Sequence, residues 1–217
     1  MKPSDLVNYL VDRVRVLFGL EQFSDIIRNT AIKEYRKGIE KVEEELDLNV
    51  LIDPENENSL ADLSVGLIKD FDEEMTTKLK KELQIAIASG DSNAMIKKKL
   101  IGFFSSKPNT SKFNWNDRLN TILRTERSRA ENKGKLDAAV NSEIPGLRKY
   151  LSVVMDDRTS EICRAEHRKY GSPEQSIPMD KPFVVTVGNK TYTAMSPPFH
   201  QNCRSEIMID TSRVKRE

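Results

Sequence analysis

The 217-residue chain has only two cysteines, two histidines and one tryptophan, and aromatic side chains make up 6% of it. So few cysteines exclude a disulfide-rich secreted scaffold and favour synthesis in a reducing compartment. No stretch approaches the ~18 uncharged apolar residues of a membrane span, and polar and charged residues interrupt the beginning of the chain, unlike a signal peptide. The sequence also lacks a glycine-rich phosphate loop, so nothing in it supports nucleotide-dependent chemistry.

The chain also lacks an excess of either positive or negative charge. Charged residues make up 32% of the chain, but they nearly cancel to a formal net charge of +1. A sequence this polar is typical of long solvated helices. The balance gives no overall basic field that would attract nucleic acid, and we interpret the run Lys97-Lys98-Lys99 as a solvated helix face.

Apolar residues recur at helical spacing through the first half of the chain. The spacing predicts a helix over residues 4–18 and a helical stripe that continues to about residue 46. A loop is expected over residues 53–58, then a long helix from Ser59 to about Ser89 and a short one over residues 94–104. We interpret these stripes as intramolecular core rather than as partner-binding surfaces.

Asn114 is placed to cap another long helix, which should run from Trp115 to about Asn141. Glu126 falls on the apolar face of this helix, where a buried carboxylate needs a partner. Arg129, three residues on, or Arg204 from the tail could supply it. We interpret Glu126 as half of a structural ion pair; the alternative is a catalytic or metal-bound acid.

After the helical part the periodicity changes to that of strands. Strands are expected over residues 148–155 and 206–209, and a hairpin is expected over residues 183–193 with its turn at Gly188-Asn189. Residues 159–168 should form a short helix or turn. The predicted fold class is therefore α+β, a long helical N-terminal arm followed by a small C-terminal α+β unit with a β-hairpin.

We expect two domains. The first is a helical region over residues 1–112, and the second covers residues 113–217. The second would consist of the long helix over residues 114–143 and the small α+β unit over residues 147–210. A unit of that size buries a marginal core and would gain stability from a staple such as a bound metal.

The scarce thiols and imidazoles all lie in that unit, as Cys163, His167, His200 and Cys203. Thiolate and imidazole ligands suit zinc, and four of them could close a tetrahedral structural site. The spacing is not that of a zinc finger, and His167 is the weakest of the four. A disulfide between Cys163 and Cys203 is one alternative, and two buried free cysteines beside hydrogen-bonded histidines are another.

The same region also allows enzymatic hypotheses. A small metal-dependent hydrolase or nuclease could use Asp156, His167 and His200 if one coordination position stayed open. A cysteine nucleophile paired with a histidine is compatible with the composition. However, the proline-rich stretch around His200 and Cys203 is not a recognisable nucleophile turn.

Four short motifs occur here in a fixed order, and together they resemble a known family. They are Arg124-Thr125-Glu126, Asp156-x-Arg158-Thr159, Cys163 four residues after that threonine, and Pro197-Pro198-x-His200-x-x-Cys203-Arg204. This order resembles the phage Mu F-like minor head proteins, the head morphogenesis proteins of tailed phages, over roughly residues 114–210. Many members have cysteines where this chain has Ser160 and Ser205, so a four-thiolate site is excluded here.

The resemblance implies a virion component rather than an enzyme, with no catalytic residue. It would be made in the host cytoplasm and reside in the head interior or at the portal vertex, in a few copies. Its partners would be the portal, capsid and scaffold proteins, with DNA as a further candidate and with neither a membrane nor a small-molecule substrate.

In this role the protein would support head assembly or DNA delivery. A structural zinc would bind Cys163, His200 and Cys203, with His167 as the candidate fourth ligand. The structural ion-pair residues would be Glu126, Arg124, Asp156, Arg158 and Arg204.

Overall fold

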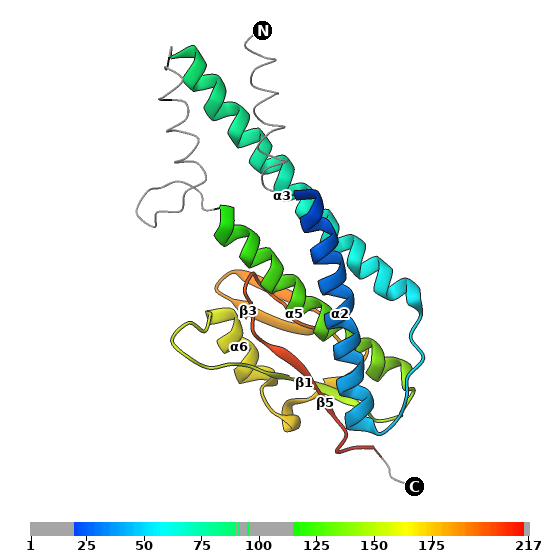
Figure 1. Cartoon of the computed structure of the whole chain (residues 1–217). Helices are drawn as coiled ribbons and strands as arrows, with labels where there is room; N and C mark the ends of the chain where they lie inside the picture. Colours follow the sequence, from blue (N-terminus) through cyan, green and yellow to red (C-terminus); the bar gives the residue numbers. More distant parts are fainter. Residues whose placement is uncertain (1–19, 90, 92–94, 96–114, 215–217) are drawn as a thin grey trace. The chain divides into compact units, whose positions relative to one another are not determined.

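The computed structural model describes residues 20–89, 91, 95 and 115–214 (Figure 1). The chain divides into two compact units, residues 1–28 with 63–121 and residues 29–62 with 122–217. We call the second the site unit. The helices expected over residues 4–18 and 94–104, and the domain boundary expected at residue 112, lie outside the described residues.

Three long helices account for most of the described chain: α2 Leu20–Leu46, α3 Pro54–Ala88 and α5 Trp115–Asn141. The ends of α2 and α5 agree with the sequence pattern. The loop expected over residues 53–58 is wrong, because α3 already begins at Pro54. The carboxylate of Asp53 accepts the backbone N–H of Glu55 at 2.9 Å and caps the helix. A proline in the first helical position lacks only an N–H that would be unsatisfied there, so Pro54 starts this helix instead of breaking it.

The C-terminal part of the site unit is a small α+β fold, which confirms the predicted class. Its elements are β1 Arg148–Ser152, α6 Glu161–Tyr170, a 3₁₀ turn Pro173–Gln175, β2 Ile177–Pro178, β3 Phe183–Val187, β4 Lys190–Ala194 and β5 Glu206–Asp210. One antiparallel sheet has the order β2-β1-β5, and β3 and β4 form the predicted hairpin. Gly188 has φ +57°, which suits a two-residue turn.

The core of this fold lies between α6, the two small sheets and α5. Leu151, Phe183 and Ile207 are fully buried there, and Leu136 of α5 packs against the same cluster. The ring of Tyr170 meets Phe183 edge to face, with centroids 5.0 Å apart. The core therefore fixes both α6 and β5, the two elements that flank the candidate site.

Two glycines allow α2 and α5 to cross closely within the site unit (Figure 1). A Cβ on Gly38 would lie 2.1 Å from the carbonyl oxygen of Glu131, and one on Gly134 would lie 2.0 Å from that of Tyr35. The hydroxyl of Tyr35 donates to Asp137 at 2.7 Å beside this crossing. Residues 29–46 of α2 thus belong to the same compact unit as the tail. Within the described residues we find no helix that has both the length and the hydrophobicity of a membrane span.

Candidate metal centre

The beginning of α6 and the loop before β5 supply the candidate ligands. Ser160 caps α6 by accepting the backbone N–H of Cys163 at 3.1 Å, which places this buried cysteine in the first turn of the helix. His200 and Cys203 come from the loop that joins β4 to β5, and the Cys203 thiol is also buried. Both cysteines are free thiols, not a disulfide.

Three of these side chains converge. One potential ligand atom each from Cys163, His200 and Cys203 lies within 4.8 Å of the others, and Nε2 of His200 is 2.9 Å from the sulfur of Cys163. Nδ1 of His200 is 2.7 Å from the carbonyl oxygen of Gln201. Because a carbonyl can only accept, Nδ1 carries a proton, so in the neutral imidazole the lone pair lies on Nε2 and faces the cluster. This is the tautomer that a metal-ligating histidine adopts.

The two thiols differ in pKa. Hydrogen bonding by Cys203, aided by Ser160 and Ser205, lowers the pKa of Cys163 to about 6 in spite of burial. The same bond to Cys163, together with burial, raises the pKa of Cys203 to about 11. The pKa of His200 is raised above its ordinary value, and the largest cause is its hydrogen bond with Cys203. Cys163 is therefore poised as a thiolate, the form that binds metal.

The donor set fits zinc in chemistry and closely in spacing. Two thiolates and a neutral imidazole are common zinc ligands. In tetrahedral coordination, a sulfur ligand and a nitrogen ligand lie about 3.5 Å apart, given Zn–S and Zn–N bonds of about 2.3 and 2.0 Å. The 2.9 Å between Cys163 and His200 is shorter, so the pair would open slightly around an ion. No large rearrangement is required.

Glu166 is a residue of this site that sequence reasoning missed. It is fully buried three residues after Cys163, and its Oε2 accepts the hydroxyl of Ser205 at 2.6 Å. Its Oε1 has no hydrogen-bond partner in the described part of the chain. Burial raises the pKa of this carboxyl to about 7. The helical spacing from Cys163 was the available signal, because a residue three positions on lies on the same helix face.

Two further contacts hold the β4–β5 loop to the rest of the site unit. The hydroxyl of Thr125 on α5 accepts the backbone N–H of Asn202 at 3.0 Å. The guanidinium of Arg204 donates to both carboxylate oxygens of Asp156, at 2.7 and 2.6 Å. Each contact joins one of the sequence motifs to the loop that carries His200 and Cys203.

The Asp-x-Arg-Thr motif forms a turn before α6, and the side chains of Asp156 and Thr159 hydrogen-bond to its backbone. The buried hydroxyl of Thr159 accepts the backbone N–H of Asp156 at 2.7 Å and donates to the carbonyl of Val154 at 2.9 Å. The carboxylate of Asp156 also accepts the backbone N–H of Arg158 at 2.9 Å. Aspartate and threonine thus shape the turn, and the Arg158 side chain is left 83% exposed.

The other predicted site residues are placed as follows. Glu126 is buried and accepts from Arg129 at 3.1 Å, one of the two partners expected for it. Arg204, the other candidate, instead binds Asp156. Arg124 is exposed on α5. His167 is exposed on α6 and is not part of the three-residue cluster.

The residues of the hydrolase hypothesis do not come together. The carboxylate of Asp156 is occupied by Arg204, and His167 lies on the exposed side of α6. Among the described residues, the cluster of potential metal ligands contains neither of them. Of the three residues that this hypothesis named, only His200 is in the cluster.

In a comparison with known protein families, the family model for "Phage Mu protein F like protein" matches residues 77–208, more than half of the chain, and this stretch includes every motif described above. No curated protein and no solved structure matches the chain.

Proposed function

Since the chain belongs to the phage Mu protein F-like family, a family of structural phage head proteins, we propose that it is a minor head protein acting at the portal vertex. In this role a few copies associate with the portal and the procapsid and support head assembly or DNA delivery. The family match over residues 77–208 is the observation that carries the proposal.

The contacts within the site unit support a structural role for the family motifs. Thr125 binds the backbone of Asn202, Asp156 binds Arg204, and Cys163 approaches His200. Each of these contacts ties the β4–β5 loop to α5, to the turn after β1, or to α6. A loop held at three points gives a fixed surface for docking, because its backbone loses little freedom on binding.

We further propose that Cys163, His200 and Cys203 bind a structural zinc ion. The convergence of the three side chains, the imidazole tautomer and the lowered pKa of Cys163 support this. A bound ion would link the first turn of α6 to the loop before β5. Its binding free energy would add to the stability of a small fold.

Co-purification with procapsids tests the proposed role in the head. Procapsids assembled with and without the portal protein would be purified, and this chain would be counted by mass spectrometry against isotope-labelled peptides. The proposal predicts a few copies per portal-containing procapsid and a near-complete loss from portal-less particles. Equal amounts in both particles, or none in either, would overturn it.

A further inference from the structure

A cleft of about 580 Å³ lies beside the candidate metal centre, entirely within the site unit. It is lined by residues of α2, α5, the turn after β1 and the loop before β5. The charged residues in its lining are Glu34, Lys37, Arg124, Arg127, Glu131, Arg158, Arg204 and Glu206. Cations therefore outnumber acids on its walls.

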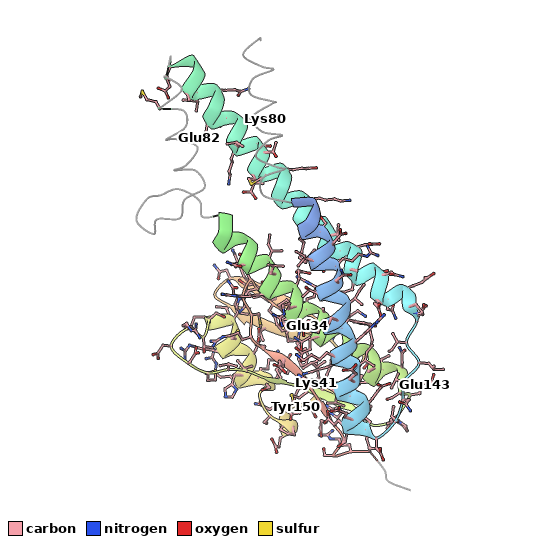
Figure 2. The ribbon with its side chains drawn as sticks, viewed as in Figure 1. Glu34, Lys41, Lys80, Glu82, Glu143 and Tyr150 are labelled. Atoms are coloured by element: carbon pink, nitrogen blue, oxygen red, sulfur yellow. The ribbon has the colours of Figure 1, made fainter. Side chains whose placement is uncertain are left out.

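The acids of the cleft are already paired. Arg127 donates to Glu34 at 2.7 Å. Glu34 is labelled on α2 in Figure 2. Lys37 pairs with both Glu34 and Glu131, Lys41 pairs with Glu131, and Lys135 pairs with Glu206. These pairs neutralise the carboxylates, and Arg204 is likewise neutralised by Asp156.

Arg124 and Arg158 are the two arginines of the cleft that form no short ion pair among the described residues. Arg158 lies 3.9 Å from its nearest carboxylate, that of Asp156, which Arg204 already holds through two shorter bonds. Within the part of the chain that the structure describes, no ion pair of Arg124 is found. The Thr and Asp residues of the same motifs have roles in the fold, whereas among the described residues Arg158 has only this long contact with Asp156 and Arg124 has no ion pair.

We propose that Arg124 and Arg158 bind the carboxylates of an acidic segment of a partner protein that enters this cleft. A guanidinium group presents paired N–H donors that match a carboxylate, and arginine is enriched at protein interfaces for this reason. The inference goes beyond the proposed role in the head and depends neither on that role nor on a bound metal.

The shape and the charges of the cleft favour a peptide over a nucleic acid. A volume of about 580 Å³ holds a few side chains, comparable to pockets for small ligands. Grooves that track a phosphate backbone are positively charged along their length. Here Glu34, Glu131 and Glu206 neutralise the cations beside them, so the excess positive charge is confined to Arg124 and Arg158 and does not run along the cleft.

Fluorescence anisotropy with defined probes tests the proposal. The full chain would be titrated into a labelled hexaglutamate peptide, a hexaglutamine peptide and a dT12 oligonucleotide at low salt. The Arg124→Gln/Arg158→Gln variant should bind hexaglutamate at least about ten-fold more weakly, as expected for two charge-assisted contacts. The Arg124→Lys/Arg158→Lys variant keeps the charges but loses the paired donors, so its affinity should lie in between.

The matched control is Arg168→Gln/Lys190→Gln, which removes the same charge from exposed positions outside the cleft. This control variant should bind hexaglutamate with the affinity of the wild type. Hexaglutamine should bind neither the wild type nor the control. Equal loss in the control variant would reveal a general charge effect and overturn the site. Absence of hexaglutamate binding, or tighter binding of dT12 that depends on the same two arginines, would overturn the acidic-peptide assignment. Circular dichroism melting of each variant separates lost binding from lost folding.

Discussion

Arg204 and Asp156, 48 positions apart in the sequence, are joined by two hydrogen bonds of 2.7 and 2.6 Å. The pair connects the turn after β1 to the residue that directly follows Cys203. Hydrogen bonding by Arg204 holds the pKa of Asp156 well below its ordinary value. Both side chains are more than a third exposed, so solvent weakens the interaction, and its main effect is to orient the loop.

Asp156→Asn should therefore lower the melting temperature slightly at neutral pH and low salt. A carboxyl with a lowered folded-state pKa stabilises the protein above its unfolded-state value of 3.8, and this contribution is lost as the pH falls toward the folded-state value. The difference between variant and wild type should shrink in acid, as measured by thermal melts across pH. Asp157→Asn, at an exposed neighbouring position, is the control and should melt like the wild type. A difference of constant size down to acid pH would contradict the role of this ion pair.

Gly134→Ala should destabilise the site unit by about 2–3 kcal/mol, in the range of overpacked interiors. The new methyl group would lie 2.0 Å from the carbonyl oxygen of Tyr35, so α2 and α5 would have to separate. Gly66→Ala is the control, because no atom of the described residues lies within 4 Å of the added group. It should raise stability by up to about 1 kcal/mol, since alanine favours helix. Urea unfolding measures both, and a neutral or stabilising Gly134→Ala would refute the close crossing.

Lys149→Met should stabilise the protein at neutral pH, and the gain should shrink as the pH rises. The Lys149 side chain is fully buried on β1 and donates to the carbonyl of Met195 at 2.8 Å. Burial lowers its pKa from 10.5 to about 8. The unfolded chain therefore binds more protons than the folded one between pH 8 and 10.5, and wild-type stability should rise by up to about 3 kcal/mol across that interval.

The check is urea unfolding of wild type and Lys149→Met at pH 7 and pH 10. Lys190→Met, at an exposed position of β4, is the control and should show no such pH-dependent difference. The same difference between Lys149→Met and wild type at both pH values would argue against a depressed pKa at this position.

Local patterns in the sequence were sufficient to locate α5, the β3–β4 hairpin and the three side chains that cluster as candidate ligands. Helical periodicity, a Gly-Asn turn and rare ligand types are visible without tertiary information. The sequence predicts a loop at Pro54, which is wrong because the same residue type both begins and breaks helices. Its role depends on the cap from Asp53.

Features that depend on packing between distant segments could not be predicted. The burial of Glu166 follows from how α6 packs into the core beside the loop before β5, and its contact with Ser205 in that loop spans 39 positions. The pairing of Glu34 with Arg127 requires the crossing of α2 and α5. The glycines at this crossing cannot be recognised as contact positions from a single sequence. His167 follows Cys163 by one helical turn, yet it lies on the exposed side of α6 and outside the cluster.

The zinc content of the purified chain shows whether Cys163, His200 and Cys203 hold a metal ion. Elemental mass spectrometry should find about one zinc ion per wild-type chain and almost none in Cys163→Ser or Cys203→Ser, with chelation lowering the wild-type melting temperature. His167→Ala should keep both the zinc and the melting temperature, because this residue lies outside the cluster. A metal-free wild-type protein whose melting temperature is unchanged by chelator and by Cys163→Ser would contradict the account.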